Sequence, residues 1–182
     1  MPKAPRLTIE HTATLDQRAL ASARHLLDSV FAGEFTDDDW DHALGGIHVL
    51  AWHDEELIGH AAVVQRQLIV AGRALRTGYV EGLGVQPQWQ RRGVGTRIMH
   101  ELRQVMRQAC ALGALSITDD SRKLYEQCGW SPWRGPTFAL TPAGLARTAE
   151  EDGGIYVLPC ADMNSLDVTA DLVCDFRAGD LW

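Results

Sequence analysis

The hexapeptide Gln90-Arg91-Arg92-Gly93-Val94-Gly95 has the composition of an anion-binding loop. It lies between an apolar run, Tyr79 to Val85, and an amphipathic segment, Thr96 to Met106, whose apolar residues recur at helical spacing. The first N–H groups of a helix have no partner within it and lie at the positive end of its dipole. The two glycines leave room for an anion to reach those groups, and the arginines add positive charge. The pattern indicates a phosphate site, and a plain turn before a surface helix is the alternative.

The loop differs from two common phosphate-binding motifs, because it lacks the Gly-Lys-Ser/Thr of a Walker loop and the third glycine of a dinucleotide fingerprint. It is similar to the Gln/Arg-x-x-Gly-x-Gly/Ala loop with which GNAT-type acetyltransferases bind the pyrophosphate of coenzyme A. That resemblance implies acetyl-CoA as the cofactor, whereas the spacing by itself implies only an anion.

Hydrophobic periodicity and capping residues predict the elements that position this loop. The predicted strands are Leu7 to His11, Gly46 to Trp52, Leu57 to Leu68, Leu75 to Val85, Ala114 to Ile117, Trp133 to Leu140 and Ile155 to Leu158. The predicted helices are one from the cap Asp16 to about Phe31, a short one opened by Thr36 and Asp39, the helix after the loop, ended by Gly113, and Ser121 to Cys128. Thr141 to Gly154 is predicted as a long functional loop. This order, with one strand–helix–strand crossover, predicts an α/β (α+β) fold.

Length and composition predict a single cytoplasmic domain, residues 1-182, with a sizeable core. No apolar run approaches the ~20 residues that cross a bilayer, and no signal peptide is expected. The four cysteines are scattered, which is typical of reduced thiols. The seven histidines show no metal-ligand spacing, so no metal is expected. We expect His48, His53 and His60 to pack or to hydrogen-bond.

Charge is divided unevenly along the chain. Its 24 acidic and 17 basic residues give a net charge of −7, which argues against a nucleic acid partner. Arginines gather at positions 91, 92, 97, 103 and 107, on or beside the anion loop, whereas acids gather at 34, 37–39 and 41, at 150–152, and at 171, 175 and 180. A basic patch for an anionic cofactor and acidic loops for a cationic substrate would divide the charge in this way.

Several further stretches share a pattern with one enzyme group. They are Phe31-Ala32-Gly33-Glu34-Phe35, Leu44-Gly45-Gly46-Ile47-His48, Gly78-Tyr79-Val80-Glu81-Gly82, Leu112-Gly113-Ala114-Leu115-Ser116, Leu124-Tyr125, Gly129-Trp130 with Pro132-Trp133, and the tail Cys174 to Trp182. Together they resemble the aminoglycoside 2'-N-acetyltransferases of the GNAT superfamily. The resemblance runs nearly from end to end of the chain, and Gly-Tyr-Val-Glu and the tail are distinctive for this group.

The resemblance implies the GNAT fold, with a central mixed, mostly antiparallel sheet flanked by helices and splayed strands holding acetyl-CoA. Leu83, Gly84 and Val85 would offer backbone groups to the thioester and the pantetheine arm, and Gly84 suits a strand bulge there. Glu81 is implied as a base that acts through water, and Tyr125 as the acid that protonates the departing thiolate. Without the resemblance, Glu81 would be interpreted as a strand-end ion-pair partner and Tyr125 as a core-edge tyrosine.

The resemblance also implies a substrate pocket. Its lining would be Glu34, Gly82, Ser116, Glu151, Asp180 and Trp182, beside Glu81, with Asp39 as a further candidate. The spacing of Asp39 from Thr36 is equally explained by helix capping. The tail is too apolar and patterned to fray, and the group resemblance suggests a homodimer.

The sequence therefore predicts acetyl-CoA-dependent N-acetylation of the 2'-amino group of aminoglycosides, which would confer resistance. No nucleophile signature is present, so direct transfer is the simpler mechanism. The first alternative is a GNAT acetyltransferase for another polycationic amine, such as a polyamine, a cell-wall amino sugar or a peptide amine. The second is a module without catalysis that binds CoA or sequesters a drug.

Overall fold

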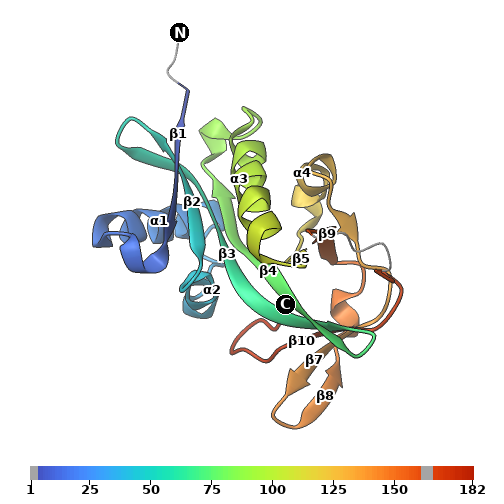
Figure 1. Ribbon diagram of the computed structural model, residues 1–182. Coiled ribbons are helices and arrows are strands. Elements are labelled where there is room, and N and C mark those ends of the chain that lie inside the picture. The colour runs from blue at the N-terminus through green and yellow to red at the C-terminus, as the bar shows by residue number, and fades with distance from the viewer. Residues whose placement is uncertain (1–3, 161–165) are drawn as a thin grey trace. The chain divides into compact units, whose positions relative to one another are not determined.

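The structure of the protein is a computed structural model that describes residues 4–160 and 166–182. Its strands are β1 (Arg6–His11), β2 (Ile47–His53), β3 (Glu56–Val70), β4 (Arg73–Val85), β5 (Leu112–Ser116), β6 (Ser131–Pro132), β7 (Thr137–Thr141), β8 (Gly144–Arg147), β9 (Ile155–Pro159) and β10 (Leu172–Cys174). Its α-helices are α1 (Gln17–Val30), α2 (Asp37–Ala43), α3 (Val94–Ala109) and α4 (Arg122–Gln127). Figure 1 shows these elements along the chain.

The chain forms two compact units, one of Met1–Val64 with Val80–Gln104 and one of Gln65–Tyr79 with Val105–Trp182. Three continuous elements, β3, β4 and α3, run through both units.

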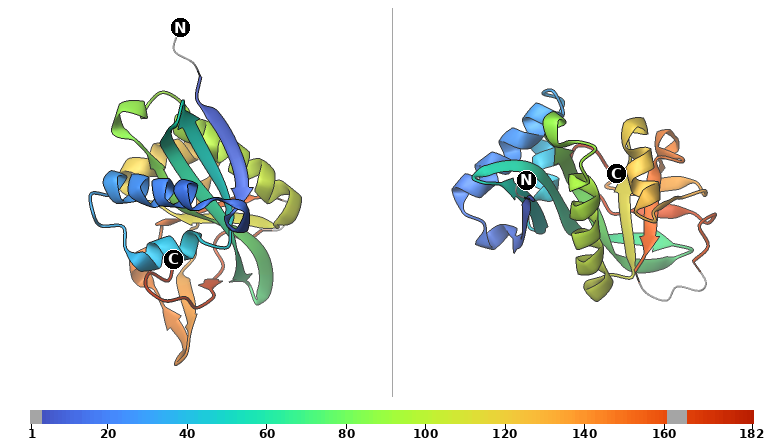
Figure 2. Two further views of the ribbon diagram at one scale, coloured as in Figure 1. Left: turned by 90° about the vertical axis from the view of Figure 1, so that its left-hand side faces the viewer. Right: turned by 90° about the horizontal axis from the view of Figure 1, so that it is seen from above.

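In the first unit, β2 lies between β1 and β3 and is antiparallel to both. One face of these strands packs on α1, where Leu50 and Leu57 form a buried cluster with Ala23 and Leu26. On the other face, Gly59 lies against Val94 and Ile98 of α3. Figure 2 (right) shows α1 and α3 on opposite sides of the strands. The helix that follows the anion loop is therefore supported by a sheet.

Both predicted helix caps of this unit are confirmed. The Ala19 N–H donates to Asp16 Oδ1 over 2.7 Å, which satisfies one unpaired N–H of the first turn of α1. Thr36 and Asp39 form a reciprocal capping box at the start of α2. These caps fix where each of the two helices begins.

In the second unit the strand order is β6-β9-β5-β4-β3-β10-β7-β8. β5 pairs in parallel with β4, as the predicted crossover requires, and β10 pairs in parallel with β7. The pairings of β10 with β3, of β9 with β5 and β6, and of β7 with β8 are antiparallel, so the prediction of a mixed, mostly antiparallel sheet is confirmed. In Figure 1, β10 lies beside the β7–β8 hairpin.

Three sequence predictions about this unit are wrong. Gly113 does not end the helix but lies within β5, where an added Cβ would meet the Trp130 ring at 3.0 Å. Trp133 to Leu140 is not one strand, because Gly135 and Pro136 interrupt it and a Cβ at Gly135 would overlap the Ala170 carbonyl. The segment predicted as a loop, Thr141 to Gly154, contains β8, which pairs with β7. Strand β10 was not predicted.

No helix among the described residues is long and apolar enough to cross a bilayer. The four cysteines are free, as predicted from their spacing.

Candidate active site

The predicted anion loop connects β4 to α3 in the first unit. Gln90 Nε2 donates to the Val85 carbonyl over 3.0 Å, which ties the loop back to the end of β4. Arg91 and Gly93 both have left-handed backbone angles, with φ of 57° and 81°. Helix α3 begins at Val94, two positions before the predicted start at Thr96, so Gly95 belongs to its first turn.

This loop is open and carries two arginines, as an anion-binding loop requires. Residues 90–93 are exposed, and an added Cβ at Gly93 would meet no atom within 4 Å. The first turn of α3 directs its N–H groups toward this open region, as helix N-termini do. Val94, which is only 3% exposed, anchors that turn in the core. The guanidinium of Arg92 lies 5.3 Å from the ring centre of Trp89, so Trp89 restrains one of the two loop cations.

The end of β4 carries the predicted base and the residues predicted to bind the thioester. Glu81, Gly82 and Leu83 are half-buried, whereas Gly84 is buried. Gly82 has a left-handed φ of 56°, so the backbone irregularity lies at Gly82, two residues before the glycine that was predicted to bulge. An added Cβ at Gly84 would lie 2.9 Å from Leu27 Cδ2, so α1 packs closely against this part of β4.

Two buried histidines lie behind Gly82. His60 Nδ1 is 2.8 Å from the Gly82 carbonyl, and His48 Nδ1 is 2.9 Å from His60 Nε2. Burial lowers the pKa of His48 to about 4 and that of His60 to about 3. His53 packs instead, with its ring 4.5 Å from that of Trp89. The prediction that these histidines pack or hydrogen-bond is confirmed.

Two of the predicted substrate residues lie around the start of α2. Glu34 is exposed in the turn after α1, where Ala32 and Gly33 are both left-handed. Asp39 Oδ2 accepts hydrogen bonds from the backbone N–H and the hydroxyl of Thr36. Its carboxylate is therefore committed to the capping box, and its role toward a substrate stays a prediction.

The predicted acid, Tyr125, lies on α4 in the second unit and is 6% exposed. Burial raises the pKa of its phenol to about 12, although a hydrogen bond with Ser121 acts in the opposite direction. Its ring meets the edge of the Trp130 ring at a centroid distance of 6.4 Å. The phenol is therefore held in place and remains protonated over the whole physiological pH range.

The remaining predicted substrate residues of this unit include two carboxylates. Ser116 is the exposed last residue of β5 and pairs with Ile155 of β9. Partial burial and then the charges of Asp180 and Glu150 raise the pKa of Glu151. Because the field of Asp180 acts on Glu151, a cation would be attracted by both carboxylates.

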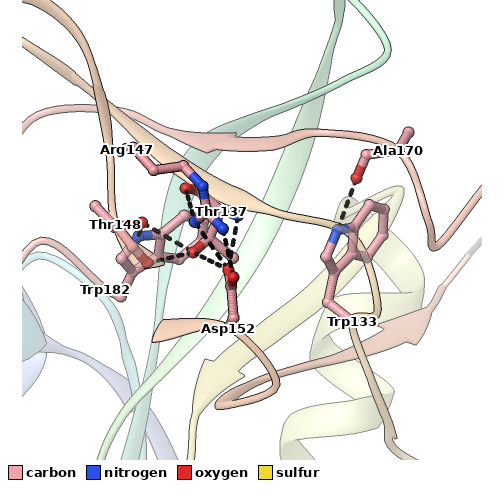
Figure 3. Close-up of polar contacts among 7 residues, drawn as sticks. All are labelled: Trp133, Thr137, Arg147, Thr148, Asp152, Ala170 and Trp182. Carbon is pink, nitrogen blue, oxygen red and sulfur yellow. Dashed lines mark hydrogen bonds and ion pairs between the residues drawn. The ribbon is translucent and has the colours of Figure 1, made fainter. Parts of the chain in front are cut away.

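Trp182 is ordered and only 3% exposed, which confirms that the tail does not fray. Figure 3 shows its indole N–H donating to Thr148 Oγ1 over 3.0 Å. Thr148 in turn donates to Thr137 Oγ1 over 2.9 Å, and Thr137 Oγ1 contacts the Asp152 carboxylate at 3.1 Å. Arg147 forms an ion pair with Asp152. A polar network therefore joins the tail to the residue that follows Glu151.

Arg66 is a residue of this site that the sequence did not reveal. It is 4% exposed, its Nε donates to Asp175 Oδ1 over 2.8 Å, and its Nη2 donates to the Leu181 carbonyl over 2.8 Å. Its guanidinium also lies 4.7 Å from the ring centre of Tyr79. Arg66 thus fastens the tail segment that carries Asp180 and Trp182. The available signal was an arginine at a position of β3 that alternates with the apolar residues Val64 and Leu68.

The predicted site residues form two groups, one in each compact unit. The first unit holds the anion loop, the end of β4 from Glu81 to Val85, Glu34 and Asp39. The second holds Ser116, Tyr125, Glu151, Asp180 and Trp182. In residues 4–160 and 166–182, His, Cys, Asp and Glu form no cluster that could hold a metal ion.

Comparison with protein families gives the class. The model of the Acetyltransferase (GNAT) family matches residues 16–130, which include the anion loop and Tyr125. A GNAT family N-acetyltransferase from Escherichia coli, solved in complex with CoA, is similar in structure with a TM-score of 0.67. The alignment has 17% identity and covers 94% of this chain and 89% of that one. The ribosomal-protein-S18-alanine N-acetyltransferase of Escherichia coli has a TM-score of 0.58 at 18% identity, over 86% of this chain and 95% of that one. The protein is thus a GNAT acetyltransferase.

A closer relative is found by sequence. The chain is 49% identical over 175 residues to a protein of Mycolicibacterium fortuitum named aminoglycoside 2'-N-acetyltransferase. That alignment covers 94% of this chain and 89% of the relative. The chain belongs to the aminoglycoside 2'-N-acetyltransferase family within the GNAT class.

Proposed function

We propose that the protein transfers an acetyl group from acetyl-CoA directly to the 2'-amino group of aminoglycoside antibiotics and thereby confers resistance to them. The observation that carries this proposal is the 49% identity, over 94% of the chain, to the Mycolicibacterium fortuitum protein of that name. The geometry supports it, because the first unit has an open anion loop and the second has a buried, protonated tyrosine.

Cofactor binding follows from the loop. The exposed N–H groups at the start of α3, with Arg91 and Arg92, would hold the pyrophosphate. Leu83, Gly84 and Val85 at the end of β4 would align the pantetheine arm, and a backbone N–H there would stabilise the oxyanion of the tetrahedral intermediate. When bound, acetyl-CoA supplies the acetyl group as an activated thioester.

The proton transfers are assigned to Glu81 and Tyr125. An amino sugar is mostly an ammonium ion near neutral pH, so Glu81 must accept a proton, directly or through one water, before the amine can attack. Tyr125 holds a proton at its Oη because burial keeps its pKa near 12. It can donate that proton as the thiolate departs, which avoids release of a poor leaving group.

Substrate recognition is electrostatic in this proposal. Aminoglycosides are polycations, and the acidic groups Glu34, Glu151 and Asp180 would attract them. Gly82 in the first unit, and Ser116 and Trp182 in the second, are the other residues proposed to contact the substrate. The raised pKa of Glu151 in the field of Asp180 indicates carboxylates that gain from a neighbouring cation. Acetylation removes one positive charge from the drug and adds bulk at that amine.

The protein is proposed to act in the cytoplasm as a homodimer and without a metal ion. Reduced cysteines are consistent with that compartment.

Release of free CoA from acetyl-CoA tests the proposal with two drugs that differ at the 2' position. Tobramycin has a 2'-amine and amikacin a 2'-hydroxyl, so we expect turnover with tobramycin and little with amikacin. Equal turnover would assign the reaction to another amine. Activity only with a polyamine, a cell-wall amino sugar or a peptide amine would show that this amine is the acceptor. If none of these amines caused thiol release, the protein would be a binding module without catalysis.

A further inference from the structure

The first unit contains a buried pair of histidines to which the proposed mechanism gives no role. His48 and His60 are each 0% exposed. In the antiparallel pairing of β2 with β3, His48 lies opposite Ala62 and His60 lies opposite Leu50. The two histidines are therefore diagonal neighbours on one face of the sheet, close enough for their rings to contact. The ring centroids are 5.2 Å apart.

When both rings are neutral, the hydrogen bonds of this pair have only one consistent direction. A carbonyl oxygen can only accept, so the contact of 2.8 Å to Gly82 requires a proton on His60 Nδ1. In a neutral ring Nε2 then accepts, and the contact of 2.9 Å requires a proton on His48 Nδ1. His48 Nε2 is then left to accept from the hydroxyl of Thr12, whose Oγ1 lies 2.7 Å from this nitrogen and 3.2 Å from the Gly46 carbonyl. Thr12 Oγ1 accepts from the Gly45 N–H over 2.9 Å.

Both histidines are neutral in this chain of hydrogen bonds. Burial, and the closeness of the second ring in the case of His60, lower their pKa values to about 4 and about 3. The tautomers are therefore fixed throughout the physiological pH range. The chain has the backbone N–H of Gly45 at one end and the carbonyl of Gly82 at the other.

Gly82 is the position in β4 where such support matters. Its left-handed φ of 56° departs from strand geometry, and its carbonyl accepts a hydrogen bond from His60 Nδ1 over 2.8 Å. A Cβ there would lie 3.1 Å from Leu27 Cδ1 and 3.6 Å from His60, so the backbone is closely packed from behind. The residue before it is Glu81, and the residues after it are those assigned to the thioester.

We infer that His60, oriented by His48 and Thr12, is a positioning residue that holds the Gly82 carbonyl and so fixes the turn of β4 on which Glu81 is carried. This inference rests on the proposed function only for its catalytic consequence, since the hydrogen-bond chain is a property of the fold. His60 contacts no reacting atom in this account. It sets the backbone from which Glu81 projects, and an error of about 1 Å in such a position costs on the order of 100-fold in rate.

The tautomers provide a test that does not need activity. ¹⁵N-edited NMR of the imidazole rings, assigned with single His48 and His60 variants, should find both rings protonated at Nδ1 and not at Nε2. Both should stay neutral from pH 7.5 to about 5.5, because the folded protein keeps their pKa values far below 6.5. A proton on His60 Nε2, or a titration of His60 near pH 6.5, would overturn the inference.

Two substitutions of His60 separate positioning from packing. His60→Asn keeps an N–H donor near the place of Nδ1, and His60→Leu keeps the volume but removes the donor. With tobramycin and acetyl-CoA, we expect His60→Leu to lower kcat by about 30- to 100-fold and His60→Asn by less than about fivefold. The KM for acetyl-CoA should change by less than about twofold in both. The exposed His25 on α1 provides the control, and His25→Asn should match the wild type.

Amide hydrogen exchange of the peptide covering residues 79–85 completes the test. Faster exchange in His60→Leu than in His60→Asn supports the inference, whereas equal exchange and equal kcat in the two variants would overturn it. If the wild-type protein acetylated no aminoglycoside, the proposed function would fail, and the tautomer and exchange measurements would still decide the role of His60.

Discussion

Tyr125 and the histidine pair demonstrate how burial assigns protonation states. The same loss of solvent that raises the pKa of the Tyr125 phenol to about 12 lowers that of His60 to about 3. In each case the neutral form is favoured, because burial penalises the charged form. The phenol remains a donor, and the imidazoles remain neutral hydrogen-bonding groups.

Replacing Tyr125 by Phe tests its assignment as the acid. Loss of the phenol proton should lower kcat with tobramycin by about 100-fold and leave the KM for acetyl-CoA nearly unchanged. Steady-state kinetics on Tyr125→Phe provides the measurement. Tyr156→Phe is the matched control, because the Tyr156 hydroxyl contacts Arg122 and Glu126 and has no assigned role in the chemistry. An unchanged kcat in Tyr125→Phe would remove Tyr125 from the mechanism.

The lowered pKa values of the buried histidines predict that the folded protein loses stability in acid. Their folded pKa values lie below the unfolded value near 6.5, so the unfolded chain takes up protons first as the pH falls. Stability is therefore complete above about pH 6.5 and declines below it, by about 2 kcal/mol for each histidine at pH 5. Urea unfolding at pH 7 and pH 5 measures the decline. His60→Asn should have a smaller dependence on pH than the wild type, and an equal dependence would contradict this origin.

Local signals in the sequence predicted the elements whose causes are local. The caps Asp16 and Thr36 and the anion loop depend on residues within a few positions of one another, and they were predicted from spacing. Strand β10 and Arg66 depend on distant partners. Arg66 contacts Asp175 and Leu181, which lie 109 and 115 positions further along the chain, and β10 pairs with β3 and β7. No local pattern encodes such pairings, which is why the support of the tail was missed.

The tail should depend on Arg66. Arg66→Met would leave the Leu181 carbonyl and the Asp175 carboxylate without their donor, at a cost of about 2 kcal/mol. We expect faster amide exchange in residues 172–182 and a KM for tobramycin raised by about fivefold or more, because Asp180 and Trp182 lose their positions. Arg73→Met, at an exposed arginine of β4, is the control. Unchanged exchange in the tail would contradict the assignment.

The support of α3 can be tested at Gly59. An added Cβ would lie 2.9 Å from Ile98 Cδ1 and 3.1 Å from Val94 Cγ1, so a side chain there presses on the helix that follows the anion loop. Gly59→Val should lower stability by about 1–3 kcal/mol and raise the KM for acetyl-CoA more than the KM for tobramycin. Gly59→Ala should have a smaller effect, since Ile98 Cδ1 is the flexible end of a side chain. A larger rise for tobramycin would contradict this role.

Across the chain, β3, β4 and α3 each pass through both compact units. Because these elements belong to both units, unfolding of one unit would disrupt the other. We therefore predict that residues 1-182 unfold as one domain, in a single cooperative transition. Thermal unfolding followed by circular dichroism and by tryptophan fluorescence should give coincident curves. Two separate transitions would indicate independent domains.

The net charge of −7 predicts a dependence on salt for a polycationic substrate. Raising NaCl from about 50 to about 300 mM shortens the Debye length by more than half, so the KM for tobramycin should rise severalfold while kcat changes little. Steady-state kinetics at both ionic strengths measures this effect. A KM for tobramycin that does not depend on salt would contradict electrostatic recognition.

The position of the acetyl group in the product decides whether the protein acts on the 2'-amine. Tobramycin, acetyl-CoA and the protein are incubated to completion, and the product is assigned by two-dimensional NMR. We predict a single amide at the 2'-nitrogen, with the other amines unmodified. An acetyl group on any other amine, or a mixture of sites, would contradict the proposed function.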